Sequence, residues 1–163
     1  MADLFPVAGA KIYIGPAQAA PDDDIAAADF TSTTWTEIAD WTQCGSFGDT
    51  SALITTAVIS RGRDVKQKGT KNAGSMQNVF AVNADDAGQI ALIAAKTSNS
   101  NFPFKIEWDD APSGVGATPT IHYFVGLVMS AQEAGGGPNT VRSLNATIEI
   151  NSNVVTVAPT DGT

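Results

Sequence analysis

Residues 141–150, which read VRSLNATIEI, contain the clearest two-faced strand of the chain. Polar and apolar side chains alternate strictly from residue 143, which is the period of a strand with one face on a hydrophobic core. The apolar face carries Leu144, Ala146, Ile148 and Ile150, and the polar face carries Ser143, Asn145, Thr147 and Glu149. We therefore expect a sheet that is buried on one side and open on the other.

Further strand patterns precede and follow this one at short intervals. Residues 102–108 (FPFKIEW) alternate in the same way, and residues 47–60 are rich in β-branched side chains. Gly and Pro residues stop several of these runs, which is typical of turns between neighbouring antiparallel strands. The expected strands are residues 11–14, 35–41 (with a bend), 47–60, 75–83, 102–108, 120–130, 141–150 and 154–157. Residues 17–34 are expected to form a loop with at most one helical turn.

One helix is expected after residue 86. Asp85 or Asp86 is expected to cap it. Asp86, followed by Gln89 three positions later, matches an acidic variant of the capping box, and the chain continues as QIALIAAK. Ile90, Ile93 and Ala94 lie on one stripe of this helix, and we expect that stripe to be its apolar face.

These elements predict a mainly β fold. We expect an antiparallel β-sandwich or barrel of six to eight strands with one flanking α-helix. A chain of 163 residues is a normal size for a single domain, so one domain is expected over residues 1–163. Within it we expect a long, mobile loop at residues 61–74, which contain three glycines, and a polar C-terminal tail at residues 158–163.

The composition excludes several classes of function. The formal net charge is -8, so a protein that binds nucleic acid through a basic footprint is not expected. One cysteine rules out an intrachain disulfide, and with one histidine it cannot build a zinc site from the usual ligands. No stretch reaches the length of about 18 apolar residues that a membrane-spanning helix needs, and the N-terminus lacks a secretory pattern. We expect no cofactor, no metal and no membrane partner, and a bacterial-type cytoplasm as the place of synthesis.

The residues that can support catalysis are isolated from one another in the sequence. His122 lies within an expected strand and fits a surface or packing role, and Cys44 precedes Gly45 in an expected turn or core position. Paired carboxylates occur at residues 22–24, 85–86 and 109–110, where solvation or helix capping explains them. We therefore predict that the protein is not an enzyme.

The strongest charge anomaly is a basic cluster in an otherwise acidic chain. It consists of Arg61, Arg63, Lys66, Lys68 and Lys71, which are five of the nine basic residues. The cluster fits a solvated loop, and it equally fits an arm that contacts an acidic surface on an identical neighbour.

The order of these features is that of a known family. The segments that carry it are WTEIADWTQCGSFGDT (35–50), RGRDVKQKGTKNAGSM (61–76), VNADDAGQIALIAAK (82–96), FPFKIEW (102–108) and HYFVGLVMSAQEAGGGPNTVRSLNATIEINS (122–152). The most specific part is a strand, then a basic loop containing KG, then N-x-D-D-x-G-Q at the start of a helix. In this order and spacing the chain resembles the tail-tube (major tail) proteins of long-tailed bacteriophages.

This resemblance implies a structural subunit that forms hexameric rings, which stack into a tube around a channel for DNA. The long loop, here residues 61–74, would contact neighbouring subunits or rings through the basic cluster. Other implied partners are the tape measure, tail terminator and distal tail proteins, with DNA present only in transit. The implied location is the virion tail, assembled in the host cytoplasm.

The polar face of residues 143–149 is the candidate lumen wall, namely Ser143, Asn145, Thr147 and Glu149. A wall without cations would let DNA pass without sticking, because phosphates meet no positive charge. A solvent-exposed sheet surface explains the same pattern. Two other functions stay open at this point: a tube subunit of a type VI secretion-like system, and a capsid decoration or adhesin-like binding module.

Overall fold

The computed structural model describes residues 4–163, so residues 1–3 of the expected domain lie outside the described part. Its strands are β1 (Lys11–Ile14), β2 (Thr36–Ile38), β3 (Trp41–Gln43), β4 (Thr50–Thr56), β5 (Val65–Asn72), β6 (Ser75–Ala81), β7 (Phe102–Glu107), β8 (Ile121–Ala134), β9 (Ser143–Ile150) and β10 (Val155–Val157). Its helices are the 3-10 helix η1 (Ala27–Phe30) and the α-helix α1 (Ala87–Thr97). The predicted mainly β fold with one flanking α-helix is confirmed.

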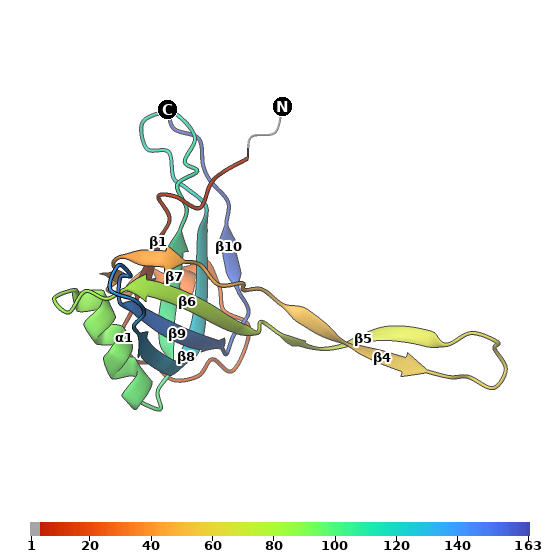
Figure 1. Cartoon of the computed structure of the whole chain (residues 1–163). Helices are drawn as coiled ribbons and strands as arrows, with labels where there is room; N and C mark the ends of the chain where they lie inside the picture. Colours follow the sequence, from red (N-terminus) through yellow and green to blue (C-terminus); the bar gives the residue numbers. More distant parts are fainter. Residues whose placement is uncertain (1–3) are drawn as a thin grey trace.

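Eight of the strands form one antiparallel sheet (Figure 1). The order is β2-β1-β7-β8-β9-β6-β3, and β10 pairs with β8. β8 is long enough to serve both halves of the sheet: its first residues pair with β7 and β10, and residues from Gly126 onward pair with β9. A register shift between Val128 and Ser130 marks a bulge in this strand, which lets the sheet bend there.

The two ends of this sheet meet. β2 and β3 are its terminal strands, yet only Ala39 and Asp40 separate them in the chain. Asp40 adopts a left-handed conformation (φ 61°), which Asp tolerates better than most residues. Its backbone carbonyl accepts from the N–H of Ala81 and its carboxylate from the side chain of Asn83, which fixes the turn to the end of β6. The bent strand expected at residues 35–41 is therefore two strands, and the sheet curls into a barrel-like body.

The inner face of the curled sheet holds the hydrophobic core. Phe80, Phe104 and Phe124 are fully buried, and the rings of the last two stack at 5.4 Å. The predicted apolar face of β9 is confirmed, because Leu144, Ala146, Ile148 and Ile150 are all buried there. Burial of three such rings, each worth about 2–3 kcal/mol, makes this core the main source of stability.

Helix α1 begins where it was predicted, but it packs on a different face. The carboxylate of Asp86 accepts from the backbone N–H of Gln89 at 2.8 Å, so the expected N-cap is present. Gln89 does not return the bond to Asp86: its side chain accepts from Asn83 N–H and donates to the carbonyls of Ala39 and Ala81. The helix is thereby tied to the point where the sheet closes.

The prediction that Ile90, Ile93 and Ala94 form the apolar face that packs on the body was wrong. Leu92 and Ala95 are buried, whereas Ile90 and Ile93 are 55% and 40% exposed. The physical reason is the close approach of Gly88 to β2, where an added Cβ would overlap the carbonyl oxygen of Glu37. This contact fixes which side of the helix lies against the sheet, and sequence periodicity does not contain it.

The expected loop at residues 61–74 was wrong for most of its length. Residues 65–72 form β5, which pairs with β4 in a separate two-stranded sheet. Figure 1 shows this hairpin extending away from the body as a long arm. The strand went unrecognised because it lacks the apolar alternation that a core imposes, and every residue of β4 is exposed.

The connection between β1 and β2 behaves as expected, with only the short η1 as regular structure. Phe30 at its end stacks on Tyr123 of β8 with ring centroids 4.8 Å apart. The C-terminal tail, expected to be simply polar, also has backbone partners. Thr160 pairs with Thr118, and Thr163 exchanges hydrogen bonds with Val115.

Candidate assembly surfaces

The first candidate surface is the β4–β5 hairpin, residues 50–72, which we call the arm. Its strands pair as Ser51 with Lys71, Leu53 with Lys68 and Thr55 with Lys66, with one extra residue of β5 between the first two pairs. Cross-strand partners share a face, and the bulge keeps Lys71 in phase with Lys68. The arm therefore presents three lysines on one face, while Arg61 and Arg63 lie in the connection at its tip.

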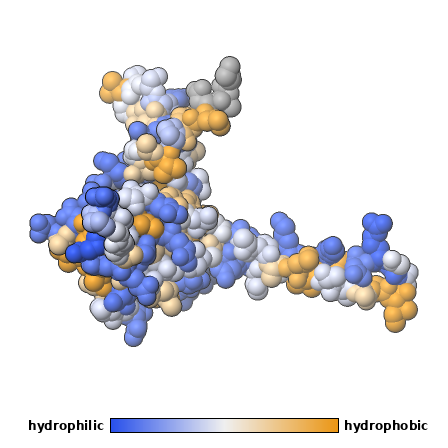
Figure 2. Space-filling view, in the orientation of Figure 1, coloured by the Kyte–Doolittle hydropathy of each residue, from blue (hydrophilic) through white to orange (hydrophobic). Residues whose placement is uncertain are grey.

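The arm has no core of its own. Leu53, Ile54 and Ile59 are 67%, 46% and 108% exposed. Figure 2 shows hydrophobic and hydrophilic patches side by side along the projection. An isolated two-stranded hairpin is marginally stable in water, so such a long one needs a further surface to pack against. Neither of the two ion pairs found within residues 4–163 involves an arm cation.

The second candidate surface is the outer face of the main sheet. Ser143, Asn145, Thr147 and Glu149 of β9 all avoid the core as predicted, and Asn145 is the most open of the four. Their cross-strand partners extend the face onto two neighbouring strands. These partners are Ser75, Gln77, Val79 and Ala81 of β6 and Leu127, Ser130, Gln132 and Ala134 of β8. Glu149 is the one charged side chain of these twelve, so the face is nearly neutral.

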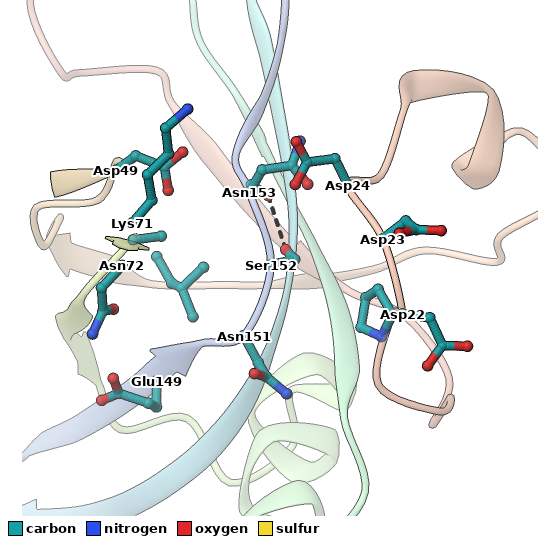
Figure 3. Close-up of a pocket in the computed structure, with 13 residues that line it drawn as sticks. Asp22, Asp23, Asp24, Asp49, Lys71, Asn72, Glu149, Asn151, Ser152 and Asn153 are labelled. Carbon is teal, nitrogen blue, oxygen red and sulfur yellow. Dashed lines mark hydrogen bonds between the residues drawn. The ribbon is translucent and has the colours of Figure 1, made fainter. Parts of the chain in front are cut away.

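The third candidate surface is a hollow at the base of the arm, which sequence reasoning missed. Its volume is about 860 Å³, and its carboxylates are Asp22, Asp23, Asp24, Asp49 and Glu149. Figure 3 shows the three consecutive aspartates on one side and Asp49 with Lys71 on the other. We call this hollow the acidic groove. Residues 22–24 were interpreted as solvated loop; the triple aspartate was the only signal, and its neighbours come from distant strands.

Hydrogen bonds hold together the two segments that border the acidic groove, the loop after Asp24 and the residues after β9. Asn153 accepts from the backbone N–H of Ile25 at 2.8 Å and donates to the carbonyl of the same residue at 3.1 Å. Ser152 donates to the carbonyl of Asn153 and accepts from the N–H of Val125. These contacts fix the aspartate loop against the segment that follows β9.

The residues considered for catalysis have structural partners. Trp108 Nε1 donates to Nδ1 of His122 at 2.8 Å, and Phe47 packs edge-on against the imidazole. Burial lowers the pKa of His122, although the nearby Asp110 carboxylate opposes this. Burial raises the pKa of the Cys44 thiol, which keeps it in the weakly nucleophilic protonated form. The histidine therefore acts as a hydrogen-bond acceptor in a packed aromatic cluster.

Two of the paired carboxylates also have structural partners. Asp110 accepts hydrogen bonds from the hydroxyl and the backbone N–H of Thr120. These bonds hold the pKa of the Asp110 carboxyl below its usual value, and the bond from the hydroxyl has the larger effect. Asp86 caps α1. Within residues 4–163, no group of three or more acidic, histidine or cysteine side chains is arranged to hold a metal ion. The same residues contain no helix both long and apolar enough to cross a membrane.

Comparisons with known proteins were made by sequence and by structure. No protein-family model matches the chain, and no curated protein matches it. A chain of the anti-feeding prophage baseplate matches with a TM-score of 0.69 and 10% identity over 97% of this chain and 98% of that one. A chain of the sheath/tube terminator complex of the PVC extracellular contractile injection system matches with a TM-score of 0.66 and 10% identity, covering 96% and 99% of the two chains.

The SPP1 phage tail tube provides a third match, with a TM-score of 0.61 and 12% identity over 94% of this chain and 80% of that one. At such low identities the likeness concerns the fold. The chain therefore has the fold of tail-tube proteins, as the sequence resemblance implied.

Proposed function

We propose that this protein is a structural subunit that assembles with copies of itself into a hollow tube. The observation that carries the proposal is the arm, a long hairpin that is exposed on both faces and projects from a body with its own buried core. A hairpin of this kind gains stability only by packing on another surface, and identical copies supply that surface at every repeat. The tail-tube fold supports the same conclusion.

In its finer form the proposal is a hexameric ring that stacks into a phage tail tube. The arm contacts neighbouring subunits or rings, and the outer sheet face with Ser143, Asn145, Thr147 and Glu149 lines the channel. A nearly neutral wall with one carboxylate per subunit lets DNA pass without a cationic trap. The proposed partners are the tape measure, tail terminator and distal tail proteins, and the proposed location is the virion tail.

A tube of a contractile injection system is the second candidate. It is favoured by the structural similarity to chains of the anti-feeding prophage and PVC assemblies. The phage and injection-system readings share the same subunit role and differ in what passes through the channel. A solitary binding module is not favoured, because it leaves the exposed arm without a partner.

Electron microscopy of the purified protein tests the proposal. We expect rings or hollow tubes as the concentration is raised, with six subunits per ring in averaged end views. A particle that stays solitary at every concentration and salt condition, with or without a tail initiator, would contradict it.

The arm is tested separately by reversing Arg61, Arg63, Lys66, Lys68 and Lys71 to Glu. We expect tubes to be lost while circular dichroism shows an unchanged fold, because the arm lies outside the core. Reversal of Lys11 and Lys96, which are exposed elsewhere, serves as the control. If the arm variant forms tubes as the wild type does, the basic residues of the arm are not needed for assembly, and this part of the proposal is wrong.

The channel wall is tested with N145K and T147K together. If this face lines the channel, tubes of the double variant still form but retain short DNA in a salt-sensitive manner, whereas wild-type tubes do not. If wild-type and variant tubes retain the same amount of DNA, this face does not line the channel.

A further inference from the structure

The acidic groove and the tip of the arm have complementary charge on one chain. The groove is lined by five carboxylates and one lysine, Lys71; the carboxylates are Asp22, Asp23, Asp24, Asp49 and Glu149. The tip and outer arm carry Arg61, Arg63, Lys66 and Lys68 against one carboxylate, Asp64. All of these arm residues are exposed, so their charges are available to a second molecule.

The two surfaces also match in apolar character. The lining of the groove also includes the apolar residues Pro21, Ala73 and Ile150. The tip carries Ile59, whose side chain is 108% exposed, two residues before Arg61. The tip therefore carries an apolar side chain close in sequence to its cations, and the groove carries apolar residues among its anions.

The groove suits an extended segment better than a single ion. Its carboxylates surround a hollow of about 860 Å³, and they do not converge as a metal-ligand group within residues 4–163. Spread negative charge is matched by several cations on a peptide, each pairing at its own place on the rim.

The tip cannot reach the groove of its own chain. Lys71 lies in the groove at the base of the arm, and β5 runs outward from it in extended conformation. At about 3.3 Å per residue, β5 spans roughly 20 Å from Lys71 to Val65, and Arg61 lies beyond that end in the connection at the tip. The contact is therefore possible only between two molecules.

We infer that the acidic groove of one copy receives the basic tip of the arm of a second copy. This inference rests on the proposed function and names the partner surface that the arm contacts. Because tip and groove are different patches of one subunit, the contact is heterologous and repeats from copy to copy, closing into a ring or continuing as a helix.

Charge exchange between two full-length variants tests the inference. One variant carries R61E and R63E in the tip, and the other carries D23K and D24K in the groove. In the tip variant alone, tip and groove are both acidic, and in the groove variant alone the net charge of the groove rises from -4 to zero, so self-association at low salt should weaken at least about tenfold. Mixed together, the unchanged basic tip of the groove variant meets the unchanged acidic groove of the tip variant, and association should return. Sedimentation velocity measures it, and added salt should weaken it.

The control variant carries D85K and D161K, which change the net charge by the same amount at exposed positions outside the groove. It should associate like the wild type. If the tip variant loses association but the groove variant does not, or if mixing restores nothing, the tip binds elsewhere and the inference is overturned.

These outcomes are distinguishable from failure of the proposed function. Wild-type tubes together with unaffected groove variants would overturn the inference and leave the tube standing. Association of the mixed pair without wild-type tubes under any condition would support the contact and overturn the tube.

Discussion

The body and the arm are both antiparallel β-structure, but they are stabilised in opposite ways. In the body, alternate side chains of β9 are buried in a core with three fully buried phenylalanines. In the arm, β4 has no buried residue and β5 has lysines where a core would require apolar side chains. The comparison supports the proposal that the body folds within one chain, whereas the arm is stabilised by contacts between chains. Substitutions in the two regions should accordingly change different measured quantities.

The largest expected effect is in the core. Phe104→Ala removes a fully buried ring that stacks on Phe124, and we expect a loss of about 3–5 kcal/mol in the free energy of unfolding. Leu53→Ala in the arm is the matched change, and the same urea titration on dilute monomer should register less than about 0.5 kcal/mol. Similar losses at the two positions would show that the arm packs within its own subunit.

A polar residue of the body provides the second test. The Oδ1 atom of buried Asn78 accepts from Trp41 Nε1 at 3.2 Å and from the N–H of Gly45 at 3.0 Å, joining β6 to β3 and to the segment that follows β3. Asn78→Ala leaves both donors without this acceptor, so unfolding should become easier by about 1–3 kcal/mol. Gln67→Ala on the exposed arm is the control, and thermal melting should not distinguish it from the wild type. An equally stable Asn78→Ala protein would contradict the assigned bonds.

Glycine substitutions sharpen the comparison because they reverse an ordinary rule. Gly→Ala in a helix usually stabilises by about 1 kcal/mol, yet at Gly88 the new methyl would overlap the backbone of β2. We expect Gly88→Ala to destabilise by about 1–3 kcal/mol. Gly62→Ala in the arm connection has no atom within 4 Å of the new Cβ and should be near neutral. Denaturant midpoints measure both, and a stabilised Gly88→Ala would show that α1 packs less closely than described.

The smallest effect concerns pH. The folded His122 has a lowered pKa because it is buried, whereas the unfolded imidazole titrates near its ordinary value of 6.5. The unfolded state therefore binds more protons, and stability should fall as the pH drops below about 6.5. Protonation at Nδ1 would also remove the bond from Trp108. His122→Gln should make the free energy of unfolding less dependent on pH between pH 7.5 and 5.5. An unchanged slope would show that another group causes the dependence.

The body was largely predictable from the sequence, and the reason is the core. Burial imposes alternation, so β7 and β9 were identified as strands, β9 with its correct faces, and the capping pattern at Asp86 marked the start of α1. The turn at Asp40 and the exposed positions of Ile90 and Ile93 were not predicted, because both depend on how α1 and β6 meet the closing sheet.

The assembly surfaces were only half predictable. The basic residues of the arm and the polar face of β9 stand out in the sequence, whereas β5 itself does not, since no core selects its side chains. The acidic groove joins residues 22–24 to Asp49 and Glu149, which are brought together only by the fold. Charge clusters are visible in sequence, but their partners are not.

Amide hydrogen exchange tests most directly whether the arm is stabilised between chains. The protein is measured first as dilute monomer and then at the concentration where it assembles. The account predicts that core amides of β7 and β9 are protected in both samples, and that amides of residues 50–72 become protected only in the assembled one. Arm amides equally protected in the monomer, or still unprotected in the assembly, would contradict it.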